Sequence, residues 1–333
     1  MISTSRPQIV LGLVAIAALL AMPWLVTSDY YVNIATQIVI AAILAMSLNV
    51  LVGFGGMVSL GHASYLGVAA YLTVYLTAHA GFGPLAGALA AIAATTILAM
   101  LFGYLALRAS GLGFLMITLA LGQILWGIAY RWASLTGGDN GLGGAVRPHP
   151  LGVDLMNPTA FFYFALIFLA AAMWLISRFI QSGLGQSLQG ARDQPRRMRA
   201  LGYNVWLIQW LSFVFAGFWG AIAGMLYAYY NQFVSPQTLH LTTSAETLLM
   251  VIAGGTGTLF GPIVGAALVV ILKNVVSAYI TRWLMLLGII FVTIVMFMPE
   301  GLVPGTRRLR GIVRKRRGSP TTPALPVTEE RPT

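Results

Sequence analysis

The chain has no cysteine and few charged residues. Cysteine is absent from all 333 positions, which excludes disulfides and thiolate-ligated metal sites. Asp, Glu, Lys and Arg make up only 8% of the chain, whereas soluble domains carry about 25% charged residues. Apolar residues make up 58%, and the mean hydropathy is +0.84. These values exclude an ordinary soluble domain and indicate a polytopic membrane protein.

Long charge-free runs give the number of membrane crossings. Between Asp29 and Arg108 lie 78 residues without one Asp, Glu, Lys or Arg, enough for three spans of about 20 residues each. Residues 1–26 resemble a secretory signal only superficially, because no clear small-residue cleavage site follows the apolar run, so we expect a first span there. The sequence predicts an all-α polytopic membrane fold of about ten transmembrane helices, at 8–27, 31–52, 63–80, 84–107, 112–133, 159–181, 204–230, 244–256, 263–281 and 283–299.

The basic residues predict the orientation. The net charge is +11, with eight of the 19 basic residues after Gly305 and four between Arg192 and Arg199. With the N-terminus inside, 15 of them face the cytoplasm and three face outside, as the positive-inside rule requires. We therefore expect both termini to be cytoplasmic. The charge then serves topology and contact with membrane lipids rather than nucleic-acid binding.

Two parts of the chain differ in composition. Residues 1–305 form the predicted transmembrane domain, and 306–333 form a basic cytoplasmic tail. The first half of the tail is polybasic and suits anionic lipid headgroups, at about 1 kcal/mol per charge. Its second half is rich in Pro and Thr and is expected to be disordered.

No catalytic, nucleotide-binding or metal-binding pattern is visible. Lys273 follows Leu272 and Lys315 follows Arg314, so the Gly-Lys-Ser/Thr signature of a P-loop cannot occur. Four histidines and eight acids are scattered, without the geometry of a metal site or an activated nucleophile. We expect neither enzymatic activity nor a cofactor.

A Gly-rich segment at 53–67, GFGGMVSLGHASYLG, is predicted to break the helical run. Glycine weakens a helix by about 1 kcal/mol relative to alanine, and a broken helix leaves amides that can hold an anionic group such as a carboxylate. Close helix packing is the alternative, since small residues let backbones approach. A lone histidine here is expected to be a hydrogen-bonding fixture rather than a proton relay. The candidate pathway residues of this segment are Asn49, Gly55, Gly56, Ser59, Gly61 and His62.

A second Gly-rich break, AGGTGTLFGPIVGA at 253–266, adds Gly254 and Gly255 to the candidate pathway. It echoes the first break, as expected of a transporter built from two repeats, although the glycine spacings differ. The span count puts both breaks on the cytoplasmic side.

Glu246 is the only acid within a predicted span, and Lys273 also lies within one. Thr243 and Glu246 have the spacing of a capping box, which favours a helix start over proton coupling. Lys273 is expected to snorkel or to make a buried hydrogen bond.

The external loop 136–142, which contains Asp139 and Asn140, is turn-rich and lies on the face where a substrate-delivery protein would dock.

One polar segment, 182–204, interrupts the apolar chain and carries four arginines against one acid. Pro195 is expected at the first position of a two-turn helix, with Asp193 or Gln194 as its N-cap and Gly202 after its last turn. So short a helix is unstable alone and is expected to rest on a partner or on the membrane. A solvated connector is the alternative.

Four stretches together resemble the LivM-type permeases of branched-chain amino acid ABC importers. They are LNVLVGFGGMVSLGHASYLGVAAYL, GFLMITLALGQILW followed by TGGDNGLGG, GQSLQGARDQPRRMRALGYN, and SAETLLMVIAGGTGTLFGPIVGA with MPEGLVPG near the end. The third resembles the loop whose short helix fits a groove on the ATPase, which places a coupling loop at 186–203. The residues assigned to coupling are Leu188, Arg192, Asp193, Gln194, Pro195, Arg196, Ala200, Leu201 and Gly202. Here, acidic and small alanine residues of the family pattern are replaced by a more basic and bulkier run.

The resemblance implies a permease subunit in the bacterial inner membrane that moves branched-chain amino acids by alternating access. The implied partners are two ATP-binding cassette subunits, a second, LivH-type permease and a periplasmic substrate-binding protein. Related permeases carry urea, short amides or other small molecules, so the substrate stays open. A self-sufficient secondary carrier or channel is the further alternative, disfavoured by the scarcity of acids within the spans.

Overall fold

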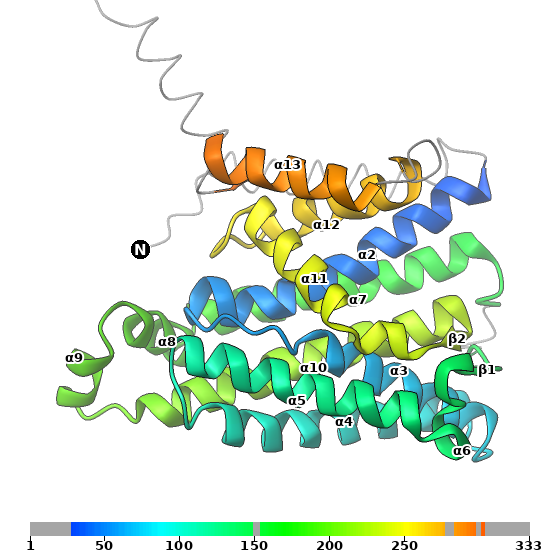
Figure 1. Ribbon diagram of the computed structural model, residues 1–333, viewed down its shortest axis with the longest axis horizontal. Helices are drawn as coiled ribbons and strands as arrows, with labels where there is room; N and C mark the ends of the chain where they lie inside the picture. Colours follow the sequence, from blue (N-terminus) through cyan, green and yellow to red (C-terminus); the bar gives the residue numbers. More distant parts are fainter. Residues whose placement is uncertain (1–27, 149–153, 277–282, 298–300, 304–333) are drawn as a thin grey trace, which may run out of the picture.

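The computed structural model describes residues 28–148, 154–276, 283–297 and 301–303. The predicted first span and the basic tail lie outside these residues. The described chain is helical apart from one short pair of strands (Figure 1). In chain order its elements are α2 (Asp29–Asn49), the π-helix η1 (Val50–Phe54), α3 (Ala63–Ala78), α4 (Pro84–Ala106), α5 (Leu112–Arg131), α6 (Ala133–Thr136), η2 (Gly138–Asn140), β1 (Leu142–Gly143), α7 (Pro158–Gln181), α8 (Gly183–Asp193), α9 (Pro195–Ala200), α10 (Val205–Asn231), β2 (Phe233–Val234), η4 (Pro236–Leu239), α11 (Leu241–Gly254), α12 (Gly261–Ile271), the π-helix η5 (Leu272–Val276) and α13 (Trp283–Phe297).

The all-α polytopic prediction is confirmed, and within the described residues each predicted span from 31–52 onwards falls on helix. Within the described residues, five helices are long and apolar enough to cross a membrane: Asp29–Phe54, α4, α5, α7 and α10. Three apolar helices are shorter: α3, α11 and the segment Gly261–Val276. The short helices are the ones that border the two Gly-rich breaks, because glycine ends the helical run there.

Helices α2 and α10 form the centre of the molecule. Of the most apolar stretch of each, 78% and 72% of the residues are buried, against 28% for α4 and 22% for α5. Small residues let α10 approach its neighbours closely: a Cβ added at Gly224 would clash with the carbonyl oxygen of Leu66, and one at Gly217 with Ala99. Helix α2 contacts α7 and α10 as well as α11 and α12, so it links these two pairs of helices.

The molecule has two distinct ends (Figure 1). We call the end that carries α8 and α9 the basic end, because it holds the four arginines of the polar segment. The opposite end carries α6 and the two strands, in which Leu142 pairs with Val234 and Gly143 with Phe233.

Arg147 fastens the opposite end. Its guanidinium donates to the carbonyl oxygens of Tyr229 (2.7 Å), Tyr230 (2.9 Å) and Leu155 (2.8 Å), and it lies 4.9 Å from the ring centre of Phe161. The last carbonyls of a helix have no partner within the helix. Arg147 therefore satisfies the end of α10 and ties it to the segment that precedes α7.

Replacing Arg147 by methionine is expected to destabilise the protein by about 2–3 kcal/mol, because charge-assisted hydrogen bonds to three carbonyl groups are lost. Arg147→Lys should recover only part of this loss, since an ammonium lacks the fork that reaches several carbonyls. Thermal unfolding in detergent, followed by size-exclusion chromatography, measures the effect. Equal stability of the methionine variant and the unaltered protein would show that the clamp is dispensable.

Candidate functional site

Asn49 joins the two Gly-rich breaks. Its Nδ2 donates to the carbonyl oxygen of Thr258 (2.8 Å), and its Oδ1 accepts from the amide of Gly257 (3.0 Å). Gly53 lies against the same loop, because a Cβ at this position would clash with both Asn49 and Gly257. We call this contact between the segment after α2 and the loop 254–260 the glycine junction. The two breaks therefore lie side by side, and their predicted position on the cytoplasmic side stays a prediction.

The backbone of the first break is largely satisfied within the protein. Helix α2 continues as the π-helix η1, with the amide of Gly55 bonded to Val50 and that of Met57 to Leu51. Farther along, the amide of Leu60 donates to the hydroxyl of Thr118 and that of Ala63 to Ser244. The sequence led us to expect free amides that could hold an anion. These four amides are instead already hydrogen-bonded within the protein. The oxygen acceptors come from η1, α5 and α11, so these bonds tie the break to three elements.

His62 is a structural fixture, as expected. It is fully buried, its Nε2 lies 2.7 Å from the hydroxyl oxygen of Ser47, and its ring packs edge-on against Tyr65. Gly61 beside it leaves no room for a side chain, since a Cβ would clash with the carbonyl oxygen of Thr118 on α5. Ser59 is also buried. This part of the segment fits the packing interpretation.

Arg192 connects the basic end to the glycine junction. Its guanidinium donates to the carbonyl oxygen of Gly53 (2.7 Å) and pairs with Asp193 (2.8 Å). Its stem crosses Gly56, where an added Cβ would lie 2.6 Å from the Arg192 Cγ. Leu188, one turn earlier on α8, is fully buried beside Gly55. Helix α8 is therefore seated directly on the first break.

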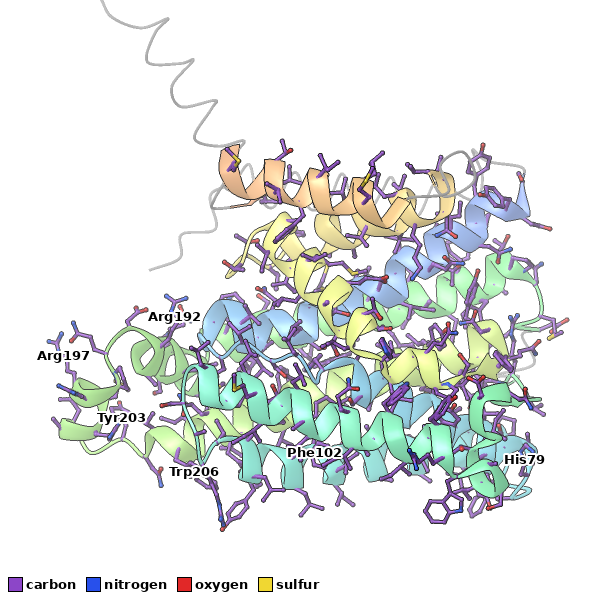
Figure 2. All side chains as sticks on the ribbon, in the orientation of Figure 1. His79, Phe102, Arg192, Arg197, Tyr203 and Trp206 are labelled. Carbon is purple, nitrogen blue, oxygen red and sulfur yellow. The ribbon has the colours of Figure 1, made fainter. Side chains whose placement is uncertain are left out.

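From Asp193 to Asn204 the polar segment is exposed, apart from the half-buried Pro195 and Met198. Figure 2 shows Arg197 and Tyr203 at the extremity of the basic end, while Arg192 lies nearer the body of the molecule. The two-turn helix that begins at Pro195 is confirmed as α9, and Gly202 follows it with φ +88°. Gln194 is the N-cap residue, but its side chain makes no capping bond, and Asp193 is the last residue of α8.

Sequence reasoning missed α8, whose 11 residues include three glycines. The residues assigned to coupling therefore divide into two groups. Leu188 is buried inside the chain and supports the surface from below. The exposed residues available to a partner at this end are Arg192, Asp193, Gln194, Arg196, Ala200, Leu201 and Gly202, with Pro195 half-buried among them.

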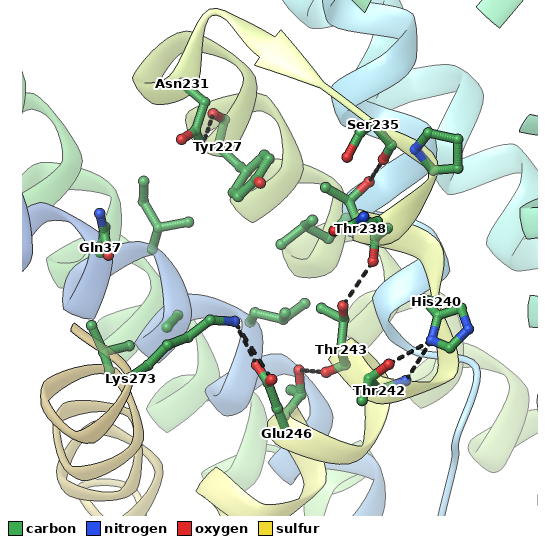
Figure 3. A pocket seen from close by; sticks show the side chains of 18 of the residues that line it. Gln37, Tyr227, Asn231, Ser235, Thr238, His240, Thr242, Thr243, Glu246 and Lys273 are labelled. Carbon is green, nitrogen blue, oxygen red and sulfur yellow. Dashed lines mark hydrogen bonds and ion pairs between the residues drawn. The ribbon is translucent and has the colours of Figure 1, made fainter. Parts of the chain in front are cut away.

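A cavity of about 730 Å³ lies between the glycine junction and the opposite end. It falls within the range of about 300–1,000 Å³ that is typical of small-molecule sites. Helices α2, α10, α11 and α12 and the turn η4 supply most of its wall (Figure 3). Asp139 of the turn-rich loop also lines it. Asn140 is exposed nearby in the same turn.

Glu246 and Lys273 face each other in this cavity (Figure 3). The Nζ of Lys273 lies 3.1 Å from Glu246 Oε2, and the glutamate side chain is 14% exposed. The predicted capping box is wrong. Helix α11 begins at Leu241, with His240 as its N-cap, three residues before the predicted N-cap Thr243. The Thr243 hydroxyl instead donates to the carbonyl oxygen of Gln237. Sequence reasoning missed the ion pair because no local pattern relates positions 27 residues apart.

The candidate pathway residues are not among those that line the cavity. They lie beneath its floor: Leu44 of the wall precedes Asn49 by five residues on α2, and Met250 precedes Gly254 by four on α11. At 1.5 Å per helical residue, these separations are about 6–8 Å. The order along the molecule is therefore cavity, glycine junction, helix α8. Gly255 belongs to the junction's loop and has φ +118°.

Comparison with known proteins gives one family. A family model described as "Branched-chain amino acid transport system / permease component" matches residues 30–296. The high-affinity branched-chain amino acid transport system permease protein LivM of Salmonella typhimurium is 28% identical, over 92% of this chain and 77% of that protein. Its namesake in Escherichia coli is 29% identical, over 89% and 75%. A probable LivM permease of Methanocaldococcus jannaschii is 25% identical over 43% of this chain and 46% of that protein. No solved structure matches the chain significantly.

Two glycine substitutions are expected to separate the junction's mechanical role from simple packing. Gly56→Ala should leave the amount of protein in the membrane near normal but lower transport, because Gly56 has φ +66° and its new Cβ displaces Arg192, at a cost of about 1–3 kcal/mol. Gly61→Ala should instead lower the amount of folded protein, because backbone of α5 would have to move.

The matched control is Gly127→Ala, a helical position with open space around the new Cβ. Immunoblots of membranes and uptake normalised to them provide the two readouts. Full transport by the Gly56→Ala variant would mean that the contact with Arg192 carries no function.

Proposed function

The chain belongs to the family of branched-chain amino acid transport permease components, and on this premise we propose that it is the membrane-spanning subunit of an ABC importer for branched-chain amino acids. The observation that carries this proposal is the family match across residues 30–296, which covers the cavity, the glycine junction and α8 together. The chain is a multi-pass transport subunit of the bacterial inner membrane. Urea or amide uptake is the alternative within the same family.

The basic end is the proposed cytoplasmic face. Four arginines between residues 192 and 199 favour the cytoplasm under the positive-inside rule. The cavity then lies toward the periplasm, the side from which an importer takes its substrate. In this orientation both termini are cytoplasmic, as the basic tail favours.

The proposed partners follow from the two ends. Permeases of this type act with ATPase and substrate-binding proteins. For this chain we propose two ATP-binding cassette subunits, one of which docks on α8 and α9, a second, LivH-type permease, and a periplasmic binding protein at the opposite end. The more basic surface of α9 favours an ATPase groove with acidic residues. The chain itself contains no Gly-Lys pair for a phosphate-binding loop.

The contacts of Arg192 suggest how ATP hydrolysis reaches the pathway. Motion of α8 acts on Gly53 through the guanidinium and on Gly55 through Leu188. Gly53 touches Asn49 and Gly257, so a displacement there strains both breaks together. Two glycine-rich segments can separate without unwinding long helices, which makes the junction the proposed gate between the cavity and the cytoplasm.

A direct uptake test distinguishes the substrates. Deleting the gene is expected to abolish high-affinity uptake of labelled leucine, and a plasmid copy should restore it, whereas urea uptake should not change. Isoleucine and valine should compete with leucine. Normal leucine uptake combined with loss of urea uptake in the deletion strain would overturn the proposed substrate.

The coupling role is tested at Leu201, an apolar side chain that is 66% exposed at the basic end. Leu201→Glu should leave membrane insertion intact but lower ATP-driven uptake by at least about tenfold, equivalent to about 1.4 kcal/mol, while Leu201→Met should behave normally. Arg192→Glu is less specific, because it also breaks the contact with Gly53.

Topology and ATP dependence are checked in the same strains. A cysteine at Gln194 should react with impermeant reagents only from the cytoplasmic side. The purified chain should hydrolyse no ATP without its ATPase partners. Labelling from outside alone would refute the orientation.

A further inference from the structure

The cavity combines an apolar surface with one ion pair, Glu246–Lys273, and a further acid, Asp139. Ile40 and Leu44 of α2, Met250 of α11, and Val269 and Val270 of α12 contribute its apolar surface. Glu246 and Lys273 face the same space, each from a different helix. The apolar residues could hold an aliphatic group, and the charged pair lies among polar side chains such as Gln37, Thr243 and Thr247, which could fix the orientation of a ligand.

The ion pair is costly to place within a span, and no capping role accounts for it. Ionisable residues inside membrane segments are rare, and their default interpretation is a functional site. The Lys273 side chain is 51% exposed, and an ion pair of this kind contributes little to stability. The pair is therefore better explained by something that it binds than by the stability that it gives.

The two partners differ in exposure. Glu246 is 14% exposed and fixed on α11, whereas the Lys273 side chain is 51% exposed and has a flexible four-carbon stem. Lys273 lies in the π-helix η5, a type of segment that is frequent at functional sites. The next residue, Asn274, anchors this part of the helix. Its Nδ2 donates to Gln37 Oε1 (2.9 Å), and Gln37 Nε2 donates to the hydroxyl of Tyr230 (3.1 Å). The ammonium can thus move away from Glu246 while its helix stays in place.

We propose that this ion pair is the recognition site for the zwitterionic part of an α-amino acid. The substrate carboxylate binds the ammonium of Lys273, and the substrate ammonium binds the carboxylate of Glu246. The aliphatic side chain then lies against Ile40, Leu44 and Met250. This inference rests on the proposed function and names the groups that would distinguish an amino acid from a neutral molecule.

Exchange of partners keeps every charge paired. Entry of the zwitterion replaces one ion pair by two, and its departure lets Glu246 and Lys273 pair again. Neither state leaves an isolated charge away from bulk water, which would be expensive. The competition between substrate and ion pair also keeps binding weak enough for release, as a transport pathway requires. Urea and simple amides carry no charge to exchange and would not open the pair.

The test uses the assembled importer, reconstituted with its ATPases and binding protein, and measures uptake of labelled leucine per amount of complex. Glu246→Gln and Lys273→Met should each lower uptake at least tenfold. The double variant with both substitutions has no unpaired charge, so it should fold, yet it should stay inactive. Asp29→Asn, which removes an acid at the start of α2 outside the cavity lining, is the control and should transport normally.

Near-normal leucine uptake by the double variant would overturn the inference, because it would show that the pair serves structure alone. A second measurement needs no variant: labelled leucine bound to the unaltered complex, without the binding protein, should be displaced by leucine but not by leucinamide or 4-methylpentanoate, which each lack one charge. Equal displacement by these analogues would also overturn it. Failure of the unaltered complex to take up leucine would instead refute the proposed function.

Discussion

The amide side chain of Asn49 holds the glycine junction together, and the arrangement of the surrounding helices depends on this contact. Inside a bilayer, every interrupted helix exposes backbone groups that water cannot satisfy. Asn49 answers this need for the loop after α11 by accepting from Gly257 and donating to Thr258. One side chain thus fixes the α11–α12 hairpin against α2. The cavity above the junction exists because these helices are held at that position.

Arg192 plays the corresponding role on the other side of the junction. Its bond to Gly53 brings the polar segment into contact with the interrupted helix. Asn49 and Arg192 meet the same short stretch of backbone, one from the membrane interior and one from the basic end. The glycines there are needed for contact more than for flexibility, since Gly53 and Gly56 leave room for neighbouring groups. Pathway and packing, which the sequence presents as alternatives, are both served by the same residues.

The ion pair in the cavity weakens the argument from the sequence against a self-sufficient carrier. Glu246 was expected to cap a helix, and that expectation disfavoured a self-sufficient carrier. With the capping box absent, Glu246 faces the cavity together with Lys273. The assignment to an importer therefore rests on family membership and on α8, not on the scarcity of acids. An ion pair at this position can bind a substrate or can tie two helices together. Binding of a charged ligand by Glu246 and Lys273 is what distinguishes the first role from the second.

The sequence alone determined the membrane class, the spans from 31–52 onwards, the helix that begins at Pro195 and the position of both breaks. These features depend on local properties: runs of apolar residues, proline and glycine placement, and clusters of charge. Tertiary structure decided which distant residues meet. Arg192 reaches Gly53 across 139 positions, Asn49 reaches Gly257 across 208, and Lys273 reaches Glu246 across 27. In a nearly all-apolar chain, hydrophobicity directs helices into the membrane but barely ranks one helix neighbour over another, so close packing and a few polar contacts make that choice.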